Sequence, residues 1–481
     1  ITENTDAAEI FIAPDGNDEN SGTIDAPFKT LDRARLAARD LKNMTSGGVI
    51  VNIRGGEYDF SKSVSFSKDD SGKGGAPIIY RAYNGEKVSF VGGEKIDNSK
   101  ISTVTSGEIY DKVKDPLAKR KLMKIDLADY QLSELSDYGY VFNYNYNPVE
   151  VTVNDSTLTV ARYPNNVKDN AYLSITDVNT EAFQSRKTPV SMTVSDPDDR
   201  MSGWSESSIK EMMVAGFFVY DWYYAAYKAA SFDKQTKTVT TENGTYYAPK
   251  KGGRICFLNI PEEIDRPGES YIDRENKVMY FYPFCDMENA DVKISQLKAS
   301  MVKLESANYI SFEGISFETT RSTPISAVSC KGLTFDGVHV RHTSNKAMSF
   351  FNCTDTAVRN CNIYDTAAGG VIFNCDDTLR KTLTPDGNII ENNVIHDVTR
   401  LYYVYAPAVQ VKGVGTEILN NKLYNSPHSL AILGGNDILF QHNEVYNAVT
   451  DGGDAAAVYW GRNPSNLGFK ILDNYFHDIG N

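Results

Sequence analysis

The chain has 481 residues, a net charge of −14 and a hydrophobic fraction of 41%, which allows a large core and excludes wholesale disorder. No run of about 18 apolar residues occurs, so we expect no membrane insertion. The acidic balance and the lack of a basic stripe argue against nucleic acid as a partner.

The N-terminal part of the chain predicts the start of a β-rich solenoid that is covered by a helix. One apolar helical face follows Pro27 and consists of Phe28, Leu31, Ala34, Ala38 and Leu41. An amphipathic helix can cover the open end of a solenoid, so we expect a capping helix here. Short β-rich runs then predict strands at 49–53, 64–66, 78–80 and 88–91.

The middle of the chain loses this pattern. Turn signals alternate with β-rich runs at 149–153, 238–241 and 278–282, which predict an inserted antiparallel β subdomain. We therefore divide the chain into three parts. These are 1–134 for the cap and first coils, 135–300 for the insertion, and 301–481 for the coils that carry a candidate groove.

An internal repeat occupies the last third. Seven segments align on one equivalent position, with spacings of 23, 23, 32, 28, 22 and 31 residues: Ile315, Val338, Cys361, Asn393, Asn421, Asn443 and Asn474. Short runs of alternating apolar and polar residues, at a base period of 22–23, predict an all-β fold, a parallel β-helix with one coil per repeat. Coils stack about 4.8 Å apart, so we expect the asparagines to form a hydrogen-bonded ladder.

The densest cluster of chemically active residues lies at 450–462, in a connection longer than the base period. Asp451 and Asp454 stand among small residues and are the candidate catalytic carboxylates. Tyr459 and Trp460 suit a sugar subsite, and Arg462 suits binding of a carboxylate or hydroxyl. A turn that only closes a coil explains the same residues equally well.

The two preceding coils add substrate-binding candidates. These are Gln410 and Lys412 on alternate positions of one strand, His428 in a turn, and Asp437 at a tight corner. For His428, a loop histidine bonded to backbone is the alternative. The aromatic stretch 217–224 is expected to pack in a core, and a wall beside a sugar groove is the alternative.

No metal site or other cofactor is predicted. The six cysteines lack zinc-binding spacing, and residues 15–21 match a calcium loop only in oxygen content. Calcium binding is left as an open possibility.

Several stretches of the chain resemble right-handed parallel β-helix glycoside hydrolases. The similarity is greatest to family 141, which includes α-L-fucosidases and xylanases, and the family 120 β-xylosidases are more distant. The stretches are 12–16, 26–31, 161–165, 380–385, 434–437 and 453–462. The resemblance implies that Asp454 is one member of a carboxylate pair, with the second acid one to two coils later. We therefore expect further coils beyond Asn481, and Asn463 departs from the family pattern, where an aspartate is usual.

The favoured function is a secreted glycoside hydrolase that acts on plant cell-wall polysaccharide or a related glycan, xylan-like or fucosylated. Ile1 is not a start methionine, which predicts either a processed mature chain, as secretion would give, or a piece cut from a longer chain. The alternatives are a polysaccharide lyase, with Lys412 or Arg462 as its base, and a non-catalytic carbohydrate-binding β-helix. In each case the expected partner is a polysaccharide or oligosaccharide.

Overall fold

The computed structural model describes residues 6–130, 132, 134–135, 147–166 and 171–480. The chain forms two compact units. The β-helix unit comprises Ile1–Glu94 with Ser295–Asn481, and the inserted unit comprises Lys95–Ile294. None of the helices in the described part of the chain has the length and hydropathy needed to span a bilayer.

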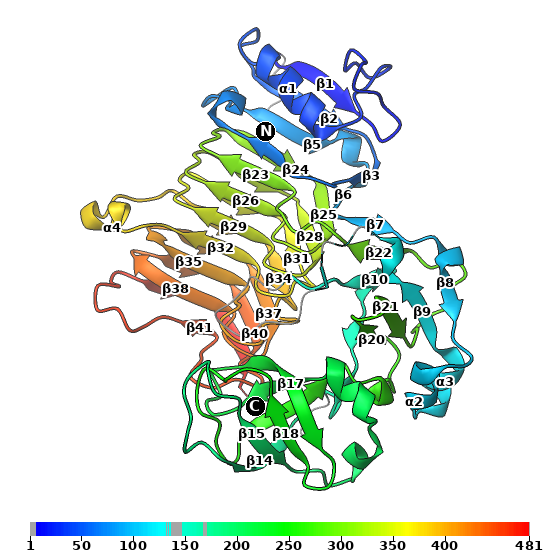
Figure 1. The fold of residues 1–481 in the computed structure, drawn as a ribbon. Helices are drawn as coiled ribbons and strands as arrows, with labels where there is room; N and C mark the ends of the chain where they lie inside the picture. The colour runs from blue at the N-terminus through cyan, green and yellow to red at the C-terminus, as the bar shows by residue number, and fades with distance from the viewer. Residues whose placement is uncertain (1–5, 131, 133, 136–146, 167–170, 481) are drawn as a thin grey trace. The chain divides into compact units, whose positions relative to one another are not determined.

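The β-helix unit is built from three parallel sheets, and each complete coil adds one strand to each sheet (Figure 1). The ten-stranded sheet contains β1 (Ala8–Ile12), β2 (Val49–Ile53), β5 (Ile78–Ala82), β24 (Ile310–Glu313), β27 (Thr334–Asp336), β30 (Ala357–Arg359), β33 (Ile389–Glu391), β36 (Glu417–Leu419), β39 (Leu439–Gln441) and β42 (Lys470–Leu472). The nine-stranded sheet contains β3 (Gly56–Asp59), β6 (Val88–Val91), β25 (Ile315–Thr320), β28 (His339–Thr343), β31 (Asn362–Ile363), β34 (Val394–His396), β37 (Lys422–Ser426), β40 (Glu444–Ala448) and β43 (Tyr475–Ile479). The eight-stranded sheet contains β4 (Val64–Phe66), β23 (Val302–Glu305), β26 (Ile325–Val328), β29 (Met348–Phe351), β32 (Val371–Asn374), β35 (Val409–Val414), β38 (Ala431–Asn436) and β41 (Val458–Tyr459).

The predicted parallel β-helix is therefore confirmed. Its core consists of the inward side chains of the three sheets, which stack from coil to coil. Phe312 lies parallel to Phe335 at 5.7 Å between ring centroids, and Phe350 lies on Phe373 at 4.5 Å. Equivalent positions stack in this way because parallel pairing without a shift places each residue beside its counterpart in the next coil.

The asparagine ladder forms at the predicted positions. Each amide oxygen accepts the backbone N–H of the preceding coil: Asn393 from Cys361 at 2.8 Å, Asn421 from Asn393 at 3.0 Å, and Asn443 from Asn421 at 2.9 Å. Asn474 completes the ladder by accepting from Asn443 at 2.8 Å. These bonds satisfy buried polar groups at a corner where the chain leaves one sheet for the next.

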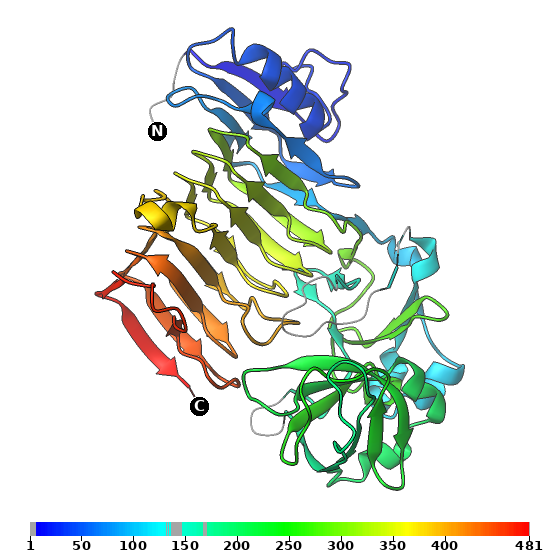
Figure 2. The same cartoon turned by 60° about the vertical axis from the view of Figure 1, so that its left-hand side comes forward.

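The predicted capping helix is α1 (Leu31–Leu41), which lies across the end of the coils that carry β1 and β2 (Figure 2). The Thr30 hydroxyl caps its N-terminus by accepting the Arg33 N–H. Leu31, Ala34 and Ala38 are buried on its inner face. A second helix of this unit, α4 (Thr378–Thr382), lies between β32 and β33.

The inserted unit is predominantly antiparallel. Its largest sheet closes on itself, because β19 pairs with both β14 and β16. This closed sheet contains β13 (Arg162–Tyr163), β14 (Leu173–Val178), β15 (Ser191–Val194), β16 (Met213–Phe217), β17 (Ala225–Asp233), β18 (Thr238–Thr241) and β19 (Arg254–Leu258). The smaller sheets contain β7 (Gly93–Lys95), β8 (Ile101–Thr103), β9 (Met123–Asp126), β10 (Val151–Val153), β11 (Ser156–Thr157), β12 (Thr159–Val160), β20 (Glu269–Asp273), β21 (Val278–Phe281) and β22 (Val292–Ser295). Two short helices, α2 (Glu108–Lys112) and α3 (Pro116–Lys121), complete the unit.

The sequence predicts that the insertion starts at residue 135, whereas the second compact unit of the structure starts at Lys95. Strand β9 pairs antiparallel with β21, more than 150 residues later in the chain, and β8 pairs with β9. This long-range pairing places β8 and β9 in the inserted unit.

Candidate active site

The candidate site lies in the connections that lead from the nine-stranded to the eight-stranded sheet in the last coils. His428 lies between β37 and β38, and Asp451 and Asp454 lie between β40 and β41. One coil earlier, Tyr405 lies between β34 and β35. Adjacent coils therefore bring residues that are about 20 to 50 positions apart in the sequence together, at the N-terminal ends of strands of the eight-stranded sheet.

The loop that carries both aspartates is fixed to the turn of the coil before it. The backbone N–H groups of Asp451 and Gly452 donate to the Pro427 carbonyl at 3.2 and 2.8 Å. Val449 N–H donates to the His428 carbonyl at 3.0 Å. The longer connection therefore folds back along its neighbour, and its position is defined by backbone hydrogen bonds.

Asp454 is held by an ion pair with another predicted residue. Its Oδ2 lies 3.1 Å from Arg462 Nη2. Asp454 has a φ of 49°, a left-handed conformation that aspartate tolerates better than most residues. The pKa of Arg462 is raised, chiefly by Tyr459 and then by Asp454 and Tyr405. Asp454, Arg462 and Tyr459 thus form one cluster.

His428 is the most enclosed member of this group, with 1% of its surface exposed. Neither ring nitrogen has a hydrogen-bond partner among the described residues. The Tyr405 ring lies against it, at 4.6 Å between centroids and an angle of 48°. Burial lowers the pKa of His428 to about 4, and the nearby Asp454 carboxylate opposes this shift. The imidazole is therefore neutral at pH 7, with one ring nitrogen as a hydrogen-bond donor and the other as an acceptor.

This buried imidazole predicts a specific pH dependence of stability. The folded pKa lies below the unfolded value of 6.5, so the unfolded chain binds more protons between pH 6.5 and 4. We expect the free energy of unfolding to decrease by about 3 kcal/mol as the pH falls through this window, because His428 takes up a proton more readily in the unfolded chain. Urea denaturation of wild type and His428→Gln at several pH values measures the difference.

The difference between wild type and His428→Gln should change with pH, and the exposed-site control His442→Gln should follow wild type. His442 is 55% exposed at its side chain. Parallel pH curves for wild type and His428→Gln would contradict the expected burial of a neutral imidazole.

The other predicted binding residues are less closely grouped. Gln410 and Lys412 project from the outer face of β35, alternating with buried Val409 and Val411. Gln410 shares a row with Tyr459, with Ile432 between them. The Lys412 ammonium lies 3.4 Å from Asp377.

Asp437 and Trp460 lie apart from the Asp454 cluster in different ways. Asp437 follows the opposite end of β38 from His428, so the extended strand separates it from the cluster. Trp460 is 46% exposed, and its ring packs edge-on against Phe469. The structure thus groups Asp451, Asp454, His428, Tyr459 and Arg462, and it adds Tyr405, which the sequence analysis did not select. The sequence signal that could have identified Tyr405 was its position in a long connection, one coil before His428.

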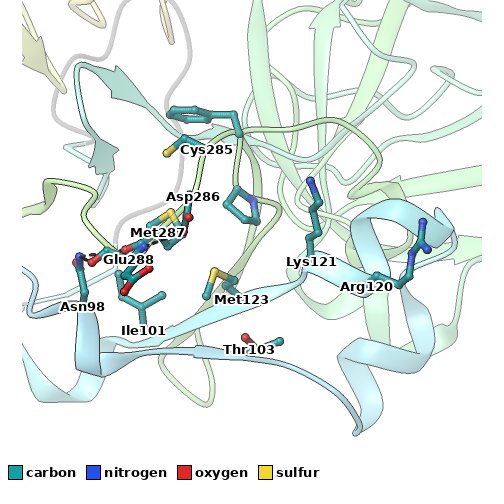
Figure 3. Close-up of a pocket in the computed structure, with 12 residues that line it drawn as sticks. Asn98, Ile101, Thr103, Arg120, Lys121, Met123, Cys285, Asp286, Met287 and Glu288 are labelled. Carbon is teal, nitrogen blue, oxygen red and sulfur yellow. Dashed lines mark hydrogen bonds between the residues drawn. The ribbon is translucent and has the colours of Figure 1, made fainter.

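The inserted unit contains a separate hollow of about 740 Å³ (Figure 3). Lys121 and Arg120 border it on one side, and Asp286 and Glu288 lie on the other. The Asn98 amide bonds to the carbonyls of Met287, Glu288 and Ala290 at its edge. None of the predicted site residues lines this hollow.

The sequence analysis did not select two buried carboxylates of the inserted unit. Burial raises the pKa of Glu263 to about 7 and that of Glu269 to about 8. Glu263 accepts from Trp204 Nε1 at 2.6 Å and pairs with Arg200 at 2.7 Å. Glu269 accepts the backbone N–H groups of Asp265 and Arg266, both at 2.9 Å. Because both side chains are almost fully buried and bonded to the protein, their contacts indicate a structural role.

No cluster of three or more histidine, cysteine, aspartate or glutamate side chains suited to a metal ion occurs within the described ranges. The six cysteines are free thiols.

Comparison with known proteins agrees with the fold. The protein-family model that describes the right-handed β-helix region matches residues 271–402. Pectate lyase PEL9 of Emericella nidulans is 38% identical over 88 residues, which are 18% of this chain and 19% of that protein. The uncharacterized protein YwoF of Bacillus subtilis is 34% identical over 94 residues, 20% of this chain and 18% of that protein. The aligned part thus spans about a fifth of each curated relative.

Two solved structures share the architecture at low sequence identity. A glycoside hydrolase has a TM-score of 0.75 at 17% identity, covering 98% of this chain and 88% of that chain. XylC in complex with xylose has a TM-score of 0.54 at 14% identity, covering 98% and 66%. The fold of this chain is therefore shared with a glycoside hydrolase and with XylC.

Proposed function

We propose that the chain is a secreted glycoside hydrolase and that Asp454 is one of its two catalytic carboxylates. The observation that carries the proposal is the Asp454–Arg462 pair at 3.1 Å, next to a buried neutral imidazole, at the edge of the eight-stranded sheet. The similarity in fold to a glycoside hydrolase and to XylC supports this reaction class. The proposed substrate is a plant cell-wall glycan of the xylan-like or fucosylated kind.

The residues of the cluster have complementary tasks in this proposal. Glycoside hydrolysis needs two carboxyl groups that flank the scissile bond. Asp454 supplies one, and we assign the other to Asp451 in the same loop. Arg462 orients Asp454, because a guanidinium holds a carboxylate with directional hydrogen bonds. His428 is buried behind the loop, where its carbonyl accepts the Val449 N–H, and Tyr459 offers a ring face to the sugar.

The direct test is incubation of the full chain with xylan and with fucosylated xyloglucan. Hydrolysis releases new reducing ends without ultraviolet absorbance from an unsaturated sugar. Release that is linear in time and enzyme concentration supports the proposal. No release from either glycan, by a protein shown to be folded, would contradict it.

A polysaccharide lyase is the second candidate, because the 88-residue match is to a pectate lyase. A lyase needs a basic side chain to abstract a proton next to a uronate carboxyl group. The two candidate bases are both paired with acids, Lys412 with Asp377 and Arg462 with Asp454, which favours the hydrolase. Unsaturated product from polygalacturonate, lost on addition of a chelator, would select the lyase.

A further inference from the structure

An aromatic cluster occupies one end of the closed sheet in the inserted unit. Tyr220 and Trp222, in the connection between β16 and β17, stack with centroids 5.1 Å apart and planes 9° apart. Tyr247, from the connection between β18 and β19, meets both rings edge-on at 5.4 and 5.6 Å. We call Tyr220 and Trp222 the aromatic platform.

The platform is held rigidly from behind. Tyr223 is 2% exposed and packs edge-on against Tyr247 at 4.9 Å. Its backbone N–H closes the turn by donating to the Tyr220 carbonyl at 3.0 Å. Tyr246 lies edge-on to Tyr247 at 4.6 Å. The two platform rings therefore keep their orientation without a ligand, which lowers the entropic cost of binding one.

The platform is also accessible and has a polar border. Tyr220 is 43% exposed, whereas most of the aromatic side chains around it are buried or half-buried. Asp221 lies between the two rings in the sequence, and its Oδ1 pairs with Arg254 Nη2 at 3.0 Å. This pair supplies a hydrogen-bond acceptor and a donor and carries one charge of each sign.

We propose that the aromatic platform binds a neutral pyranose unit of a glycan. The C–H face of a pyranose is apolar and stacks on an aromatic ring, while its rim of hydroxyls needs donors and acceptors such as Arg254 and Asp221. The Asp221–Arg254 pair carries no net charge, which favours a neutral over a uronic sugar at the platform. The proposal adds a glycan-binding site to the one proposed around Asp454, and it requires no turnover.

Affinity electrophoresis of the full chain, in native gels that contain xylan, xyloglucan or polygalacturonate, tests the proposal. We expect retardation by a neutral glycan and weaker retardation by polygalacturonate. Tyr220→Ala should weaken the binding about tenfold, the loss of about 1.4 kcal/mol that a stacked ring supplies. Trp222→Ala should have a similar effect, and Trp222→Phe should restore most of the binding.

The matched control is Tyr475→Ala, which removes an exposed tyrosine of the β-helix unit and should bind like wild type. Circular dichroism of each variant reports whether it is folded. Equal retardation of wild type and Tyr220→Ala would overturn the proposal, as would retardation by polygalacturonate alone or by none of the glycans. Binding without hydrolysis would leave this proposal intact and count against the hydrolase, so the two proposals fail separately.

Discussion

Asp454→Asn is expected to reduce hydrolysis of the responsive glycan by about a thousandfold, because a positioned carboxyl group contributes about 10²–10⁴ in rate. Asparagine keeps the size of the side chain and tolerates the left-handed backbone at this position. It cannot transfer a proton or attack the anomeric carbon. Initial rates of reducing-end release, at substrate concentrations above and below the KM, measure the loss.

Asp355→Asn is the matched control for this substitution. Asp355 has a φ of 50° and lies 3.3 Å from a basic partner, Lys331, so it resembles Asp454 in backbone and pairing. It lies in an earlier coil, in the connection between β29 and β30, and should retain full activity. If Asp451 is the second carboxylate, Asp451→Asn should lose activity to a similar extent. Activity of Asp454→Asn within a few-fold of wild type would remove Asp454 from the reaction.

Asn421→Ala should lower the free energy of unfolding of the β-helix unit by about 3 kcal/mol or more. The Asn421 side chain accepts from Asn393 N–H and Nδ2, and it donates to the Ile390 carbonyl and Asn443 Oδ1. Truncation leaves several buried polar groups without a partner, and each costs about 1–3 kcal/mol. Asn421 is 1% exposed, so water does not replace these bonds.

Urea denaturation followed by tryptophan fluorescence measures this effect in the correct unit. The chain has three tryptophans, and Trp460 is the one in the β-helix unit. Substituting Trp204 and Trp222 by phenylalanine therefore gives a background in which the signal reports on the last coils. Asn474→Ala is the control at the less buried end of the same ladder, and it should destabilise the unit by less than half as much. Equal effects at both positions would show that burial does not set the strength of the ladder.

The sequence contained enough information to predict the β-helix and its register. The aligned position that runs from Ile315 to Asn474 stacks in the structure as predicted, coil on coil. It was visible because each coil faces nearly the same environment as its neighbours, so the same residue types recur at the same place. The capping helix was visible for a related reason, since one apolar face at helical spacing has to be buried.

Only part of the candidate site could be predicted from the sequence. Asp454 and Arg462 are eight residues apart, and their pairing follows from one local loop. The burial of His428 against Tyr405 depends on how two neighbouring connections fold over each other, which no local pattern encodes. Asp437 lies only nine residues after His428 in the sequence, but the extended strand β38 between them carries it to the opposite end of that strand.

The solenoid, its period, its register and the loop that carries the candidate acid could thus be predicted from the amino-acid pattern. These features repeat or depend on near neighbours in the chain. The start of the insertion at Lys95, the closed antiparallel sheet and the enclosure of His428 became apparent from the folded chain. Each of these depends on pairing or packing between distant residues, for which the local pattern of apolar and polar residues carries no partner information.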